Sequence, residues 1–134
     1  MRVLIVDPCE RFRTTMRRVF AASGFCAVGA PNFTAASAPL RKKRFVLVVA
    51  QLSRNATRNV AVVMAVQTQT ATPILFVGQR GLPELPDKFE GAAEAIVAPF
   101  DLEKLIERAA SLIARYRDLA QLQAALAHQG RERR

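Results

Sequence analysis

The chain has 134 residues, of which 51% are hydrophobic and 23% are charged. This composition predicts one folded domain with its own core and excludes a disordered chain. Its apolar runs are too short to cross a bilayer, and Asp7 follows the first of them too soon for a signal peptide. We therefore expect no membrane span and a cytoplasmic protein.

The formal net charge is +9, which is unusually basic for a chain of this length. Such a charge favours acidic partners, namely nucleic acid, an anionic membrane surface or an acidic protein. The other interpretation is that arginine only keeps the protein soluble, and both stay open. Cys9 and Cys26 have no CxxC spacing and no neighbouring histidine, so we expect buried small side chains rather than a disulfide, a metal site or a cofactor site.

Short apolar runs alternate with amphipathic segments along the chain, a pattern typical of repeated strand–helix units. Gly24 stands where the first helix should end, and Asn32 and Asp101 are suited to cap the starts of two others. We expect Pro39 to break or kink the second helix. The predicted strands cover residues 3–6, 25–30, 45–50, 73–77 and 95–97, and the predicted helices cover 9–23, 32–43, 57–68 and 101–128.

The segment 79–86 contains Gly81, Pro83 and Pro86, so a full-length fourth helix is not expected there. A short turn through Lys88 and Phe89 is predicted in its place. Five strand–helix units with right-handed crossovers predict an α/β fold, a flavodoxin-like (βα)5 doubly wound parallel sheet of order 2-1-3-4-5. Ligands of such sheets bind at the carboxyl ends of the strands. In this chain those ends carry Asp7, Gln51, Gly78 and Ala98.

Several segments, in their order and spacing, resemble a bacterial response-regulator receiver domain. Residues 4–7 (LIVD) are similar to the family's first strand and its acidic end, and 44–52 (RFVLVVAQL) are similar to its third strand. Residues 24–28 and 73–77 are similar to strands two and four, and 99–101 (PFD) to the turn into the last helix. The resemblance covers residues 1–117.

The resemblance implies a phosphoacceptor pocket, but this chain departs from the family's residues there. Receivers accept a phosphoryl group on an aspartate that ends strand three, and Gln51 stands at that position. An amide has neither the charge nor the nucleophilicity for this reaction. No aspartate or glutamate occurs between Pro31 and Leu82, so no shift in register restores the acceptor. The family's acidic pair for Mg²⁺ is reduced to Asp7 followed by Pro8, a poor site for a hard cation.

Three further family positions are altered. Gly78 replaces the hydroxyl residue after strand four, Ala95 the aromatic switch residue of strand five, and Ala98 the lysine that pairs with the phosphate. The sequence therefore predicts a degenerate receiver without phosphorylation, catalytic residues, bound metal or enzymatic activity. Gln51 either mimics a fixed state of the domain or is simply tolerated. Asp7 is either a vestigial ligand or a partner of the backbone after strand one.

Two basic clusters are candidate interaction residues. Arg11 and Arg18 flank the apolar stripe of the first helix, and Arg41, Lys42 and Lys43 precede strand three. The alternative interpretation is that these side chains cover the edge of the core with their aliphatic stems. No aromatic residues alternate with them as base stacking would require, which disfavours single-strand binding.

The last helix is longer than a receiver needs. Leucines recur every seven residues at 105, 112, 119 and 126, and an unbroken helix over 101–128 would measure roughly 40 Å. Leu119, Leu122 and Leu126 would then project past the domain, as at the start of a coiled coil. A frayed tail through residues 130–134 is the alternative.

These observations divide the chain into a pseudo-receiver domain, 1–117, and a C-terminal helical extension, 118–134. The leading hypothesis is a phosphorylation-independent interaction or scaffold module in bacterial signal transduction. Its partner would be a protein, a second copy bound through the last helix included. The alternative is a basic module that binds nucleic acid or another polyanion, which is less favoured.

Overall fold

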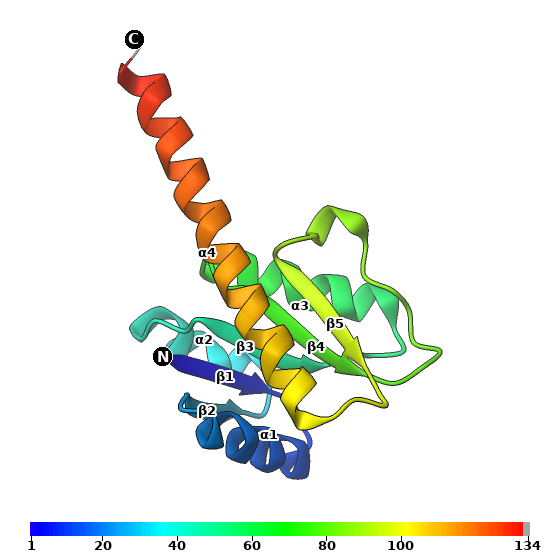
Figure 1. The fold of residues 1–134 in the computed structure, drawn as a ribbon. Helices are drawn as coiled ribbons and strands as arrows, with labels where there is room; N and C mark the ends of the chain where they lie inside the picture. Colours follow the sequence, from blue (N-terminus) through cyan, green and yellow to red (C-terminus); the bar gives the residue numbers. More distant parts are fainter. Residues whose placement is uncertain (133–134) are drawn as a thin grey trace.

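The computed structural model describes the backbone of residues 1–132 and the side chains of residues 1–130. Five parallel strands form one sheet of order β2-β1-β3-β4-β5, which confirms the predicted topology (Figure 1). The elements in chain order are β1 (Arg2–Val6), α1 (Glu10–Ala22), β2 (Cys26–Ala30), α2 (Phe33–Lys42), β3 (Leu47–Gln51), α3 (Ala56–Gln69), β4 (Ile74–Gly78), the 3₁₀ turn η1 (Asp87–Phe89), β5 (Ala93–Val97) and α4 (Leu102–Glu132).

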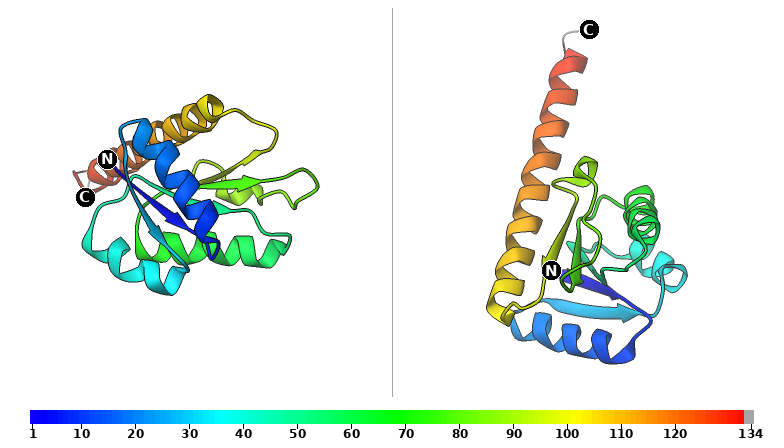
Figure 2. Two further views of the ribbon diagram at one scale, coloured as in Figure 1. Left: turned by 90° about the horizontal axis from the view of Figure 1, so that it is seen from below. Right: turned by 90° about the vertical axis from the view of Figure 1, so that its right-hand side faces the viewer.

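The sheet separates two hydrophobic layers because successive strand side chains point to opposite faces. Val3 and Ile5 pack with α1 and α4, whereas Leu4 and Val6 pack with α2, α3 and η1. The two further views of the ribbon show this division, with α1 and α4 on one side of the sheet and α2 and α3 on the other (Figure 2). The central strands are buried on both faces, which explains their nearly continuous apolar sequences.

The predicted helix boundaries rest on capping residues that the structure confirms. Asn32 Oδ1 accepts the amide of Ala35 at 2.8 Å, and Asp101 Oδ1 accepts the amide of Lys104 at 2.8 Å. Gly24 follows α1 with a φ of 92°, a left-handed conformation that glycine adopts without steric cost. The local sequence therefore determines where these helices begin and end.

Four predictions are wrong in detail. The predicted break at Pro39 is absent, because Pro39 lies inside α2 and Ala36 and Leu40 on either side are buried in the core; the alternative, a kink, stays a prediction. Strand β3 begins at Leu47 rather than at 45, and β5 begins at Ala93 rather than at 95 because it pairs with β4 along its whole length. Both cysteines are free and exposed rather than buried.

The segment between β4 and β5, where a receiver has a full helix, is a loop with one 3₁₀ turn, η1. The prolines in this segment predicted that outcome. The last helix, α4, runs for 31 residues, about 46 Å, and continues through Gly130. Its first half packs on the sheet and its second half projects beyond the domain (Figures 1 and 2). The alternative prediction of a frayed tail over residues 130–134 is wrong for residues 130–132, which are helical. Residues 133–134 lie outside the described part of the chain. No helix among the described residues is long and apolar enough to span a membrane.

Tyr116 joins α4 to α3. Its hydroxyl lies 3.4 Å from Gln67 Oε1, and burial raises the pKa of Tyr116 above the usual tyrosine value. The folded state therefore holds the proton more tightly than the unfolded chain, and this contribution to stability is lost as the pH rises through the tyrosine range. Between about pH 9 and about pH 11 the wild-type free energy of unfolding should fall further than that of Tyr116→Phe. Urea denaturation of both proteins at each pH measures the difference, and parallel decreases would contradict it.

Candidate functional site

The carboxyl ends of β3, β4 and β5 enclose a pocket of about 380 Å³. Of the six positions compared with the receiver phosphoacceptor site, it brings together Gln51, Gly78 and Ala98. No lining residue carries a carboxylate, and the one charged lining residue is Arg54. The residues that line it are Phe12, Gln51, Leu52, Arg54, Val77, Gly78, Gln79, Leu82, Ala98 and Phe100.

Gln51 is the last residue of β3 and lies beside Val77 of β4. Its side chain is exposed at the mouth of the pocket, whereas the next residue, Leu52, is buried. The loop that follows is fixed by Asn59 of α3, whose side chain accepts the Ser53 amide and donates to the Ser53 carbonyl, both at 2.8 Å. The position thus has a defined backbone but no nucleophile.

Gly78 ends β4 opposite this residue, and the space above it is filled by leucines. A Cβ atom on Gly78 would lie 3.1 Å from Leu52 Cβ and Cδ2 and 3.3 Å from Leu82 Cδ1. Neither a threonine nor a serine fits there without movement of the strand or of Leu52. The pocket is therefore packed with apolar groups at the position where a receiver's hydroxyl would meet phosphoryl oxygens.

We expect Gly78→Ala to lower the free energy of unfolding by about 1–3 kcal/mol, because Leu52 Cβ is attached to the backbone and cannot rotate away. This exceeds the stabilisation of about 0.4–1 kcal/mol that a glycine-to-alanine change gives through the unfolded chain. Gly130→Ala is the matched control, since nothing lies within 4 Å of its added Cβ. Urea denaturation should show loss for the first variant and none for the second. Equal stability of both would refute the packing argument.

Asp7 and Pro8 lie beside the pocket without lining it. Asp7 is buried, and its Oδ2 accepts the backbone amide of Cys9 at 2.7 Å. Arg13 of α1 donates to the backbone carbonyls of Asp7 and Pro8 at 2.7 and 3.1 Å. The carboxylate is therefore engaged by the chain itself. Among the described residues, no three histidines, cysteines or acidic residues gather as metal ligands.

Ala95 and Ala98 belong to β5 and the turn after it. Ala95 pairs with Phe76 and borders a second pocket, of about 430 Å³, under the loop that contains η1. The amide of Ala98 donates to the Gly78 carbonyl at 2.9 Å, which closes the end of the sheet. Neither methyl group can neutralise an anion.

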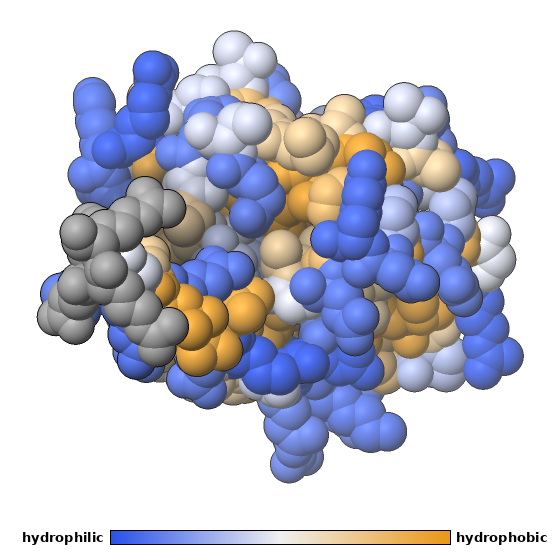
Figure 3. Space-filling model, turned by 90° about the horizontal axis from the view of Figure 1, so that it is seen from above, coloured by the Kyte–Doolittle hydropathy of each residue, from blue (hydrophilic) through white to orange (hydrophobic). Residues whose placement is uncertain are grey.

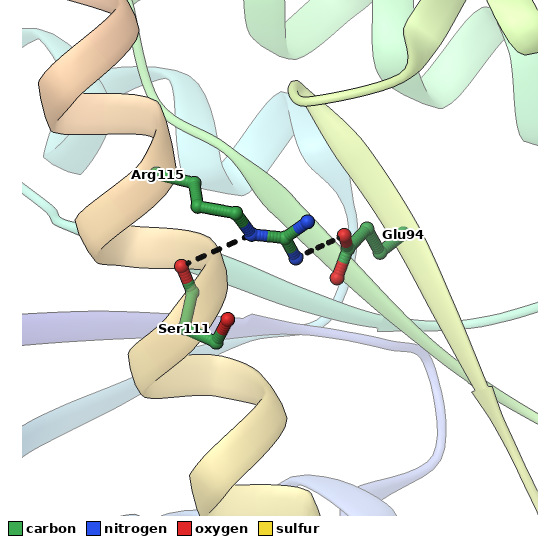
Figure 4. Close-up of polar contacts among 3 residues, drawn as sticks. All are labelled: Glu94, Ser111 and Arg115. Carbon is green, nitrogen blue, oxygen red and sulfur yellow. Dashed lines mark hydrogen bonds and ion pairs between the residues drawn. The ribbon is translucent and has the colours of Figure 1, made fainter.

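An ion pair between Arg115 and Glu94 links α4 to β5 (Figure 4). Arg115 reaches from α4 to Glu94 Oε1, and its Nε donates to the Ser111 carbonyl at 3.4 Å. The arginine side chain is 55% exposed, so the pair contributes at most about 1 kcal/mol.

The predicted interaction residues fall into three separate surfaces. Leu119, Leu122 and Leu126 follow one side of α4 and are 41, 56 and 58% exposed. The arginines at 11 and 18 are exposed on α1, on one face of the sheet. The basic residues 41–43 are exposed at the end of α2, on the opposite face, so the two basic clusters do not form one patch.

Sequence reasoning missed the residues that shape the pocket and its surroundings. Arg13, Asn59, Leu52 and Leu82 all act through backbone groups or packing that only the fold brings together. The one available signal was the apolar Leu52 directly after the acceptor position.

Comparison with known proteins gives no matching family model and no matching curated protein. Solved structures do match. A receiver domain protein from Methanospirillum hungatei aligns with a TM-score of 0.68 and 18% identity over 87% of this chain and 97% of that one. The chemotaxis protein CheY4 of Vibrio cholerae aligns with a TM-score of 0.65 and 25% identity over 83% of this chain and 97% of that one.

The chain has the receiver-domain fold. A third structure, a fusion that carries the trimeric coiled coil of yeast Spc42, aligns with a TM-score of 0.73 and 15% identity over 98% of this chain and 93% of that one. The predicted resemblance is confirmed for the fold. Gln51 lines the pocket at the carboxyl ends of the strands of this fold.

Proposed function

We propose that the protein is a phosphorylation-independent pseudo-receiver, a non-enzymatic interaction module of bacterial two-component signalling that acts in the cytoplasm. The observation that carries the proposal is the pocket at the ends of β3 and β4. Gln51 takes the acceptor position, and Leu52 and Leu82 occupy the space above Gly78. Phosphoryl transfer in receivers needs a carboxylate nucleophile and carboxylate ligands for Mg²⁺, and no residue that lines the pocket carries a carboxylate.

The module self-associates through the leucine face, which we define as Leu119, Leu122 and Leu126 of α4. Leu105 and Leu112 are fully buried on the sheet at the same heptad position at which Leu119 and Leu126 are exposed. Residues 119–130 carry no aspartate, glutamate, lysine or arginine, and the three leucines are the large apolar side chains of this projecting stretch. A second helix against the leucine face would supply the packing that the domain supplies to the first half of α4. The coiled-coil fusion among the similar structures is consistent with this arrangement.

Light scattering of the full chain over a concentration series, with and without acetyl phosphate and Mg²⁺, tests the combined proposal. The average mass should rise above one copy with concentration, and both series should coincide. A chain that associates only with the phosphodonor would contradict independence from phosphorylation.

Polyanion binding is the second candidate, favoured by the exposed basic residues 41–44 and by the net charge. Counterion release would make such binding fall steeply with salt. Anisotropy of a labelled DNA duplex should then decrease strongly between about 50 mM and about 200 mM salt. Self-association through leucines should change little over the same range, which separates the two candidates.

A further inference from the structure

A groove lies where α4 leaves the sheet, on a different side of the helix from the leucine face. It has a volume of about 570 Å³ and is bounded by α4 and by the residues that enter β3 and β4. Ile113, Ala120 and Ala124 form its helical wall. In an α-helix these positions share one side, and Leu122 and Leu126 point to another. The groove is thus a surface that self-association leaves free.

The floor of the groove is apolar and its polar groups are already bonded. Phe45 and Pro73 are buried there. Thr72 donates to the Phe45 carbonyl at 3.3 Å, and Gln67 donates to the Thr72 carbonyl at 2.6 Å. These bonds hold the floor in place without a ligand. Seen from above, the molecule exposes hydrophobic surface between surrounding hydrophilic side chains (Figure 3).

The rim of the groove is basic. Arg44 and Arg117 line it and are exposed, and no acidic residue lines it. Arg117 contacts the neutral Sδ atom of Met1 at 3.9 Å, and the salt bridge between Arg115 and Glu94 lies elsewhere. No aspartate or glutamate occurs between Glu10 and Glu84, so the segment that supplies the floor carries no counterion of its own.

We propose that this groove docks an acidic amphipathic helix of a partner protein, with apolar side chains on the floor and carboxylates at Arg44 and Arg117. The small side chains of Ala120 and Ala124 allow a helix to approach α4 closely. The apolar floor favours a protein over nucleic acid, because phosphates gain nothing from it and Phe45 is too buried to stack on bases. The basic rim would speed association and select acidic sequences.

Selection of displayed random peptides of about 16 residues on the full chain tests the docking chemistry. Selection on Arg44→Glu/Arg117→Glu runs in parallel. The wild-type chain should enrich peptides that combine aspartate or glutamate with leucine, isoleucine or phenylalanine at spacings of three and four residues. Absence of such sequences, or their equal enrichment on the variant, would overturn the proposal.

The Kd of an enriched peptide, labelled and measured by fluorescence anisotropy, then distinguishes the contribution of the groove's shape from that of its basic rim. Its Kd should rise at least about tenfold for Arg44→Glu/Arg117→Glu and for Ala120→Phe, which fills the groove without a change in charge. The control Arg11→Glu/Arg18→Glu should stay within about twofold of the wild type. Equal weakening by the control, no effect of Ala120→Phe, or displacement of the peptide by a DNA duplex at equal concentration would each refute the proposal. Light scattering of Ala120→Phe should match the wild type, because the leucine face is intact.

Discussion

Replacing Leu119, Leu122 and Leu126 together by glutamine is expected to leave a monomer at concentrations where the wild-type chain self-associates. Glutamine has nearly the helix propensity of leucine, so α4 should keep its length while the leucine face loses its apolar area. Sedimentation velocity of both proteins measures the change directly. The expected effect is large because these three side chains make up the whole face.

The strength of the association follows from how much surface remains to be buried. Each leucine is about half exposed, so covering it gains about 1 kcal/mol, and six leucines in a pair of helices gain about 6 kcal/mol. Part of this is offset by the lost rotational and translational freedom of the partners. The association is therefore weak, and the concentration series should extend to about 0.5 mM, within the range expected for such small interfaces.

A triple variant on another side of the same helix is the matched control. Ala120→Gln, Ala124→Gln and Ala127→Gln occupy positions that point away from a partner on the leucine face. This protein should associate as the wild type does. A wild-type chain that stays monomeric throughout, or a control that also becomes monomeric, would contradict the assignment of the leucine face.

Leu112→Ala is expected to lower the free energy of unfolding by about 3 kcal/mol, because it removes a fully buried side chain that anchors α4 to the sheet. Leu112 packs with Val3, Ile5 and Phe20 in the layer beneath α4. The cavity left behind cannot close without movement of the helix or of β1. Urea denaturation at low protein concentration measures this change in the free energy of unfolding without a contribution from self-association.

Leu126→Ala provides the comparison at the same heptad position, 14 residues further along the helix. Its side chain is 58% exposed, so the same chemical change should cost less than about 0.5 kcal/mol in the monomer. A similar loss for both variants would mean that residue 126 is buried in the monomer. That result would remove the basis for the leucine face.

Much of the fold could be predicted from the sequence, because local patterns and tertiary packing agree. Buried strands appear as apolar runs, and Asn32, Asp101 and Gly24 mark helix ends through bonds or backbone angles that need only nearby residues. The absence of a full helix between β4 and β5 could also be predicted from local sequence, because Pro83 and Pro86 have no backbone N–H to donate.

Errors arose where distant contacts override the local preference. Pro39 is disfavoured inside a helix, yet the buried residues around it keep α2 continuous. Strand β5 gains two residues through its pairing with β4, which no local pattern records. The acceptor position could be found from its place after an apolar run. The contact of Leu52 and Leu82 above Gly78 depends on residues far apart in the chain and required the structure.

Intact-mass spectrometry of the full chain after incubation with acetyl phosphate and Mg²⁺ tests the central claim most directly. A receiver domain with an intact acceptor aspartate serves as the positive control in the same experiment. The mass of this chain should stay unchanged while that of the control rises by one phosphoryl group. A single added phosphoryl group that hydroxylamine removes, as expected for an aspartyl phosphate, would contradict it.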